Sequence, residues 1–146
     1  MHEGEFAIGQ ALVRRLVDGQ FPQWRDRSLT RVPSSGTVHA MYRLGDDLAV
    51  RLPRLAEFGP ALERELDLLA RVAPFLPLRI PTVAARGEPT AAYPASWSVL
   101  QWIEGEPLSS HPVADPIDTA THLGEFVVAM RSINLPGESS PNQRGR

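Results

Sequence analysis

The stretch TVHAMYRLGDDLAVRLPR, residues 37–54, predicts two β-strands joined by a tight turn. Gly45-Asp46-Asp47 separates two short segments in which apolar residues recur at every second position, as in a half-buried hairpin. The second strand divides its side chains between two faces, with Leu48, Val50 and Leu52 on one and Ala49 and Arg51 on the other. Arg51 is then either an ordinary solvated side chain on an exposed sheet face or a cation that binds a phosphate.

The rest of the chain predicts an α+β fold with the order helix, three strands, helix, two strands, helix. Short turns between the strands favour a five-stranded antiparallel sheet with helices packed on it. The predicted helices cover 5–18, with Gly19 as the stop, about 59–72, and about 115–133; the predicted strands cover 28–34, 37–44, 47–53, 82–87 and 96–103.

Composition limits the classes of function that remain. The chain has 146 residues, enough for one domain with a substantial core, and a net charge of -2, which gives no reason to expect a nucleic acid or an anionic membrane as partner. It has no cysteine, which excludes disulfides and thiolate metal sites, and its histidines show no metal-ligand spacing. Without a signal-peptide pattern or a membrane-spanning apolar run, we expect a cytoplasmic protein.

The predicted helix over 59–72 carries a carboxylate on its apolar side. At 100° per residue, Glu65 falls near the middle of the arc formed by the apolar residues Leu62, Leu66, Leu68, Leu69 and Val72. A buried carboxylate is costly unless it meets a cation. An Arg51–Glu65 pair would satisfy both residues, although Glu65 could instead lie at the helix edge and bond a surface cation such as Arg64.

Small residues precede the two-strand segment, in PSSGTVHAMYRLG (33–45), where a loop could bring backbone N–H groups close to an anion. An ordinary hairpin would use the same residues. The order matters more than the loop itself: a small-residue hairpin, a cation on the next strand and an acid on the next helix match the ATP-binding half of a protein kinase-like fold.

Four segments, taken together, resemble the N-terminal portion of the aminoglycoside phosphotransferase family. They occur in the family's order: SSGTVHAMYRLGDDLAVRLPR (34–54), LERELDLLARVAPFLPLRIPTV (62–83), YPASWSVLQWIEGEPL (93–108) and PNQRGR (141–146). Members of this family are kinase-like enzymes that move the γ-phosphate of ATP onto hydroxyl groups of small molecules. The resemblance implies a kinase-like N-terminal lobe over residues 1–105, followed over 106–146 by a linker, a helix and a polar tail that begin a C-terminal lobe absent from this chain.

The resemblance also implies roles for individual residues. Ser35, Gly36 and Thr37 would lie in the loop over the ATP phosphates. Arg51 stands where such enzymes usually carry a lysine that holds the α- and β-phosphates, and Glu65 stands where its helix partner lies. Arginine keeps the charge of lysine but changes its reach and geometry.

The segment SVLQWIEG would connect the two lobes. There Leu100 would lie behind the adenine, and backbone groups of Gln101 and Ile103 would bond its edge. Trp97 and Trp102 could stack nearby or pack in the core. His39 departs from the asparagine expected in this branch of the family.

Phosphoryl transfer also needs a base that orients the acceptor hydroxyl and ligands for Mg²⁺. In the family these come from a His-Gly-Asp-type loop and a later aspartate, and neither is found in this sequence; His122-Leu123-Gly124-Glu125 lies within a predicted helix. We therefore expect a nucleotide-binding portion that does not transfer phosphate by itself and that pairs with a separate C-terminal lobe or self-associates. Two alternatives remain: a non-catalytic interaction module with the same fold, and a small α+β binding domain unrelated to kinases.

Overall fold

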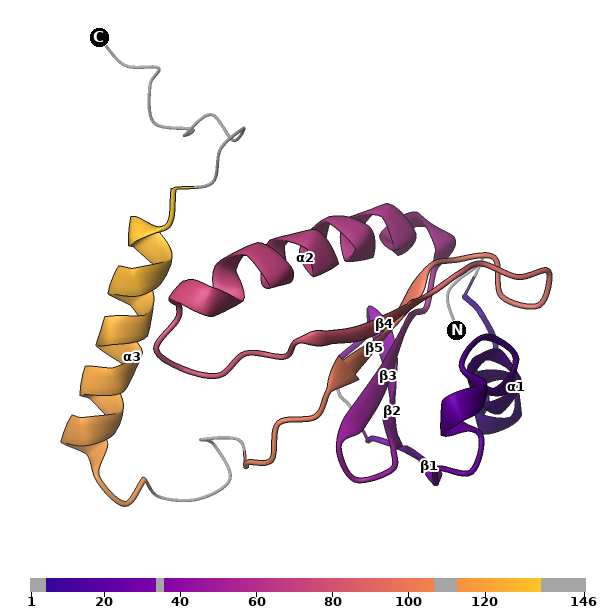
Figure 1. Cartoon of the computed structure of the whole chain (residues 1–146), viewed down its shortest axis with the longest axis horizontal. Helices are drawn as coiled ribbons and strands as arrows, with labels where there is room; N and C mark the ends of the chain where they lie inside the picture. The colour runs from indigo at the N-terminus through magenta and orange to yellow at the C-terminus, as the bar shows by residue number, and fades with distance from the viewer. Residues whose placement is uncertain (1–4, 34–35, 107–112, 135–146) are drawn as a thin grey trace, which may run out of the picture.

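Five strands form a single antiparallel sheet in the computed structural model, in the order β1-β2-β3-β5-β4 (Figure 1). The structure describes residues 5–33, 36–106 and 113–134. The strands are β1 (Leu29–Arg31), β2 (His39–Leu44), β3 (Leu48–Pro53), β4 (Val83–Gly87) and β5 (Trp97–Gln101). The α+β fold with a five-stranded antiparallel sheet is therefore confirmed.

The β2–β3 hairpin sets the register of the sheet. Gly45 has a φ of 63°, a left-handed conformation that residues with a Cβ rarely adopt, and it begins the predicted turn. Opposite residues on the two strands are Met41 with Arg51 and Arg43 with Ala49. Side chains alternate between the two faces along a strand, so Arg51 shares a face with Ala49 and not with Val50, and the directly opposed Met41 and Arg43 lie on that face as well.

The main core lies between the sheet and α1 (Gln10–Gln20). It takes the alternate residues of β2, β3 and β5 together with the buried side of α1: Val13, Leu16, Val17, Ala40, Tyr42, Leu44, Leu48, Val50, Leu52, Trp97 and Val99. Trp97 is fully buried and packs edge-on against Phe21, at 5.5 Å between ring centroids. Of the two interpretations of this tryptophan, the structure supports the core position.

The predicted boundaries of the first helix are wrong. The helix begins at Gln10 because Gly9 is extended and the chain before it runs beside β3, where the Phe6 N–H donates to the Arg54 carbonyl. Ile8 is buried, but it precedes the helix. Gly19 does not stop the helix, which ends one residue later.

A second helix, α2 (Gly59–Val72), packs on the opposite face of the sheet (Figure 1). Its boundaries match the prediction, and Pro60 lies in its first turn, where a missing N–H is harmless. Leu62 and Leu66 are buried against Leu100 of β5. Leu68 is 37% exposed, which corrects its predicted place on the buried stripe. It lies about 120° around the helix from Leu62, beyond the narrow contact with the sheet.

The third helix, α3 (Pro116–Ser132), lies beyond the end of the sheet (Figure 1). Asp115 caps it as predicted, because its carboxylate accepts from the N–H groups of Ile117 and Asp118. No described residue of α3 is buried, and its large apolar side chains are exposed: Ile117, Leu123, Val127, Val128 and Met130. None of the helices within the described ranges is long and apolar enough to cross a membrane.

Candidate functional site

The face of the sheet that carries α2 also carries the predicted cation. Cross-strand pairing places Met41, Arg51 and Ser98 in one row and Arg43, Ala49 and Leu100 in the next. Through Leu62 and Leu66, α2 packs on the β5 end of these rows. The half-buried polar and charged side chains lie at the other end, on β2 and β3, where a ligand can approach them.

Arg51 and Glu65 form the predicted pair. The Arg51 guanidinium donates through Nη1 to Oε1 of Glu65, at 2.5 Å, and through Nη2 to Oε2, at 3.0 Å. Such two-point contacts fix the plane of a guanidinium as well as its distance from the acid. Each terminal nitrogen carries two N–H groups, so this contact leaves donors free for other acceptors.

The pair is less buried than its expected place on an apolar stripe implies. The Arg51 side chain is 18% exposed, and the Glu65 side chain is 42% exposed. Glu65 lies about 60° around α2 from Leu62, at the margin of the contact with the sheet. The pair is therefore accessible from solvent and contributes about 1 kcal/mol or less to folding. Its position, open to a ligand on one side, suits binding better than it suits core stability.

His39 is a third member of this cluster, which the sequence marked only as a departure from asparagine. Its Nδ1 lies 3.4 Å from Nη2 of Arg51. Burial, and then the charge of Arg51, lower the pKa of His39 to about 4, while Glu65 acts in the opposite direction. The ring is therefore neutral at pH 7. The alternation of side chains along β2 could have identified His39 as a neighbour of Arg51, because residues 39, 41 and 43 share the face of Arg51.

The lowered pKa of His39 predicts a pH-dependent stability. The unfolded chain takes up a proton at pH about 6.5 and the folded chain only at about 4, so the folded state loses stability as the pH falls between these values. We expect the free energy of unfolding to fall by about 2 kcal/mol over this pH range, after allowance for the partial exposure of the ring. Urea unfolding of wild type and His39→Asn from pH 7.5 to 4 measures it as the difference between the two curves; parallel curves would contradict the lowered pKa.

The loop that should cover the phosphates lies only partly within the described residues. Gly36 and Thr37 are exposed, immediately before β2, and Ser35 lies outside the described residues. Beyond the loop, the Arg54 N–H donates to the Val38 carbonyl at 2.8 Å. This bond ties the start of β2 to the end of β3, one residue beyond the His39–Pro53 pair that ends the hairpin register. The loop therefore ends beside the cluster of His39, Arg51 and Glu65.

The predicted connection to a second lobe follows β5. Leu100 is buried on the face shared with Arg51, next to Ala49. Gln101 uses its N–H to donate to the Thr82 carbonyl at 2.8 Å, so its N–H is not free for a ligand. The Gln101 carbonyl and the backbone of Ile103 remain the candidates for bonding a base edge.

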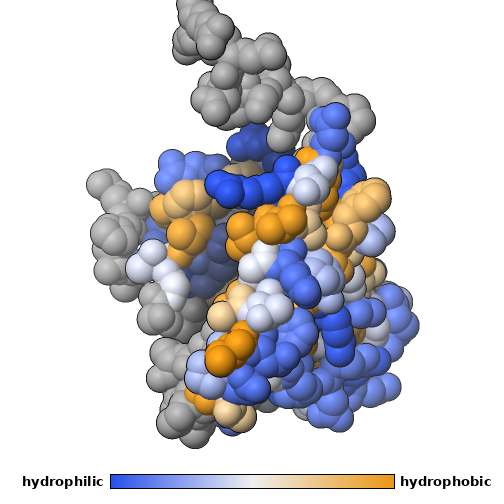
Figure 2. Space-filling view, turned by 90° about the vertical axis from the view of Figure 1, so that its left-hand side faces the viewer, coloured by the Kyte–Doolittle hydropathy of each residue, from blue (hydrophilic) through white to orange (hydrophobic). Residues whose placement is uncertain are grey.

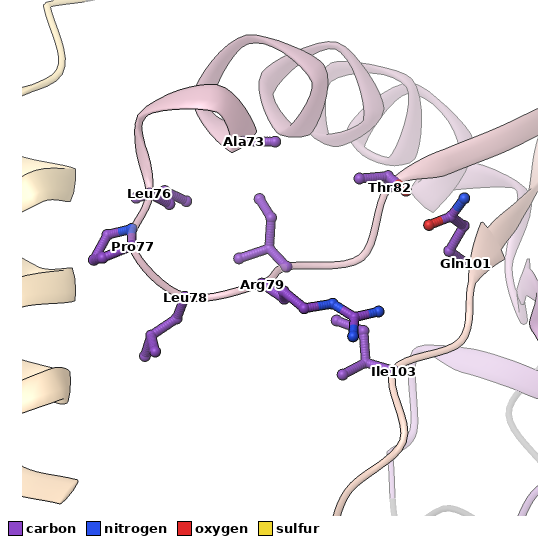
Figure 3. A pocket seen from close by; sticks show the side chains of 9 residues that line it. Ala73, Leu76, Pro77, Leu78, Arg79, Thr82, Gln101 and Ile103 are labelled. Carbon is purple, nitrogen blue, oxygen red and sulfur yellow. The ribbon is translucent and has the colours of Figure 1, made fainter. Parts of the chain in front are cut away.

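Two pockets flank this connection. One, of about 250 Å³, lies between the segment after α2 and the connection, and Figure 3 shows Arg79 extending toward Ile103 across it. The other, of about 380 Å³, is lined by residues that include Thr30, Arg43 and Trp102. The second pocket lies on the face of Arg51, because Thr30 and Arg43 are paired and Arg43 is paired with Ala49.

Arg43 and Trp102 shape the second pocket, and the sequence did not assign a role to Arg43. The Arg43 guanidinium lies 4.7 Å from the centroid of the Trp102 ring, a cation–π contact, and it also pairs with Glu104. Ala49 lies between Arg43 and Leu100 in one cross-strand row, and its small side chain adds little bulk to this face of the sheet, which we call the floor. The position of Ala49 two residues before Arg51 is the signal that could have identified this floor.

Within the ranges that the structure describes, no cluster of three or more His, Asp or Glu side chains could hold a metal ion. The side chains around Arg51 offer cationic and hydrogen-bonding chemistry: a guanidinium with donors not used by Glu65, a neutral imidazole, and apolar residues of the sheet beside the Trp102 ring. That combination suits a planar base joined to an anionic group.

Solved structures of known proteins match the fold of this chain. The GDP complex of wild-type aminoglycoside 2'-phosphotransferase-IIIa superposes with a TM-score of 0.78 at 17% identity, covering 87% of this chain and 43% of that one. The streptomycin-ATP-APH(2")-IIa ternary complex gives a TM-score of 0.65 at 17% identity, covering 90% and 43%. ADP-bound APH(2'')-Ib gives 0.61 at 18% identity, covering 83% and 40%. No curated protein matches in sequence.

The five-stranded sheet with its helices forms the N-terminal lobe of a kinase-like fold, as the structural matches show. A model of the phosphotransferase enzyme family matches residues 30–146, and the chain belongs to that family. The resemblance to aminoglycoside phosphotransferases is thus confirmed. The chain spans about two fifths of the length of the solved structures that it matches.

Proposed function

We propose that this chain is the nucleotide-binding portion of an aminoglycoside phosphotransferase-like kinase, with ATP on the face of the sheet that carries α2. The observation that supports it most is the two-point contact between Arg51 and Glu65, beside the start of β2 and open to solvent on one side. A charged guanidinium with free donors is well suited to phosphate oxygens. The matched structures contain GDP, ATP or ADP, so a purine nucleotide is the ligand class of similar folds.

In this proposal the nucleotide lies along the rows of the sheet. The phosphates contact Arg51 and the loop of Ser35, Gly36 and Thr37, while the base lies near Leu100 and bonds the backbone of Gln101 and Ile103. Glu65 orients Arg51 and does not touch the nucleotide. Because the Gln101 N–H donates to the Thr82 carbonyl, the proposal uses the carbonyl of Gln101, not its N–H, for the contact with the base.

The complete reaction would transfer the γ-phosphate of ATP to a hydroxyl of a small molecule. It needs a residue that orients the hydroxyl and ligands for Mg²⁺, which neutralises the phosphate charges during transfer. We propose that residues 1–105 form the nucleotide-binding lobe and 106–146 the start of a second lobe that supplies those groups. This chain alone then binds ATP without transferring phosphate, and a cytoplasmic location would give it access to ATP.

Titration of the full chain with ATP and Mg²⁺, followed by calorimetry and by the thermal unfolding midpoint, tests the proposal. Half of a cleft binds weakly, so we expect a dissociation constant in the high micromolar to millimolar range, about -4 to -6 kcal/mol. The thermal midpoint should rise with ATP concentration because ligand binds only the folded state. Binding of adenosine as tight as that of ATP would contradict a phosphate site at Arg51.

A second candidate function is an interaction module that binds a separate C-terminal lobe or a second copy of the chain. The observation that favours it is the exposure of the apolar side chains of α3. Figure 2, which views the molecule from the side of α3, shows apolar residues on this face among polar ones. Exposed apolar surface of this kind, if contiguous, is typical of a protein interface.

This second candidate predicts self-association of the isolated chain. We expect the average mass measured by light scattering to rise with concentration, and the double variant Leu123→Glu/Val127→Glu to lower it at equal concentration. Both side chains are exposed, so the variant should leave the thermal midpoint within about 2 °C of the wild-type value. A wild-type chain that stays monomeric at millimolar concentration would contradict an unsatisfied apolar surface.

A further inference from the structure

The place of His39 in the cluster is defined by its two ring nitrogens. Nδ1 lies 3.4 Å from the Nη2 atom of Arg51. Nε2 is buried and has no hydrogen-bond partner among the residues that the structure describes. The two charged groups that influence the ring are Arg51, on the adjacent strand, and Glu65, on α2.

The contact with Arg51 determines the tautomer of His39. A guanidinium can only donate hydrogen bonds, so Nδ1 must accept and carry no proton. The single proton of the neutral ring is then on Nε2. A protonated ring would remove the acceptor and place a second positive charge beside Arg51. The loss of this hydrogen bond and the repulsion between the two positive charges both disfavour protonation of the ring, in agreement with its lowered pKa.

Arg51 is therefore held from two directions. Glu65 accepts one N–H from each terminal nitrogen, and His39 faces the Nη2 atom that already binds Oε2 of Glu65. With both N–H groups of Nη2 occupied, the contacts among the described residues leave one N–H of Nη1 and the N–H of Nε for a ligand. A lysine ammonium could rotate its donors freely, whereas the planar guanidinium has one fixed set of directions.

We propose that His39 is a positioning residue for the phosphate site: its Nδ1 accepts a hydrogen bond from Nη2 of Arg51 and, together with Glu65, directs the remaining donors of the guanidinium toward the nucleotide. This inference rests on the proposed function, because it assigns a phosphate to Arg51. His39 acts through Arg51 and does not itself contact the nucleotide.

The side-chain chemistry at position 39 provides a matched series of variants. Oδ1 of asparagine is bonded to Cγ, as Nδ1 of histidine is, so His39→Asn keeps an acceptor at nearly the same distance from the backbone. His39→Leu places a methyl group there and removes the acceptor.

The first test measures the ring itself and needs no nucleotide. Long-range ¹H–¹⁵N correlation spectra of the full chain should show His39 with Nδ1 unprotonated and Nε2 protonated, and the ring should stay neutral down to about pH 5. In Arg51→Met, the pKa of His39 should rise because the neighbouring positive charge is gone. A ring protonated on Nδ1 at neutral pH, or a pKa unchanged in Arg51→Met, would overturn the proposal.

The second test measures binding of ATP with Mg²⁺ to wild type, to His39→Leu, to Arg51→Met and to the double variant. We expect His39→Leu to weaken ATP binding about 5- to 10-fold in the wild-type background and less than about twofold with Arg51→Met, because His39 acts through the guanidinium. His39→Asn should restore affinity to within about threefold. Equal losses in both backgrounds would overturn the proposal, as would failure of the asparagine variant to restore binding.

The two tests distinguish a failure of the proposed nucleotide site from a failure of the proposed role of His39. If wild type does not bind ATP, the proposed nucleotide site fails, while the ring spectra still decide whether His39 accepts from Arg51. If wild type binds ATP and Arg51→Met weakens binding, but His39→Leu does not change it, the nucleotide site stands and the role of His39 fails. Thermal midpoints of all variants, measured alongside, identify any that is simply unfolded.

Discussion

Gly87→Ala is expected to destabilise the fold by about 3 kcal/mol or more, enough to unfold a marginally stable domain. Gly87 ends β4 directly opposite Trp97, and a Cβ at this position would lie 1.9 Å from Cε2 of the indole ring. No pair of carbon atoms can approach so closely without a shift of the backbone or of the ring. Trp97 cannot move away easily, because it is fully buried beside Phe21 and the main core surrounds it.

Urea unfolding followed by tryptophan fluorescence measures this loss. Gly19→Ala is the matched control, because nothing lies within 4 Å of a Cβ at Gly19 and the residue lies inside α1. Alanine there should be neutral or should stabilise the helix by about 0.5–1 kcal/mol. If the two variants have equal midpoints, the close approach between Gly87 and Trp97 does not exist in solution.

Arg51→Met is expected to weaken binding of ATP with Mg²⁺ about 10- to 100-fold while leaving the fold nearly intact. A hydrogen bond to a charged group contributes about 1.5–3 kcal/mol to binding. Loss of that free energy corresponds to a dissociation constant about 10- to 100-fold higher. The fold should tolerate the change, because Glu65 is 42% exposed and its unpaired carboxylate is solvated. The thermal midpoint should therefore change little, which separates loss of binding from loss of structure.

Arg86→Met is the control for this experiment. Arg86 also connects a strand to α2, through Glu63 at 3.0 Å and Asp67 at 2.6 Å, but it lies on β4, at the far edge of the sheet, and is exposed. Its loss should leave ATP binding within about twofold and cost about 1 kcal/mol or less. Equal effects of the two substitutions on ATP binding would show that Arg51 has no special role and would remove the main support for the proposed site.

Much of the fold was accessible from local patterns. Alternation of apolar residues, the glycine of the β2–β3 turn and the proline in the first turn of α2 are effects of neighbouring residues, so strands, turn and helix were predicted close to their observed positions. The first helix was misplaced because Ile8 has the spacing of a helix but is buried as part of an extended segment bonded to the strand end at Arg54. That contact spans more than forty residues of sequence, beyond the reach of local periodicity.

The candidate site was likewise predictable in part from local patterns and in part not. Helical periodicity and the apolar strand together suggested the Arg51–Glu65 pair, and the pair exists. Its exposure was not predicted, because the width of the contact between α2 and the sheet depends on which strands lie beneath the helix. The roles of Arg43 and His39 also depend on strand register, which brings residues 39, 43 and 51 to one face.

The sequence by itself determined the order of elements, the hairpin, the acid on the second helix and the family, because each is encoded in short patterns or in motifs that follow one another along the chain. Only the tertiary structure decided which faces these elements share: that Arg51 meets His39 as well as Glu65, that Trp97 lies in the core against the backbone of Gly87, and that α3 leaves its apolar side exposed. These relations join residues distant in sequence, and they are set by register and packing, which local propensity does not specify.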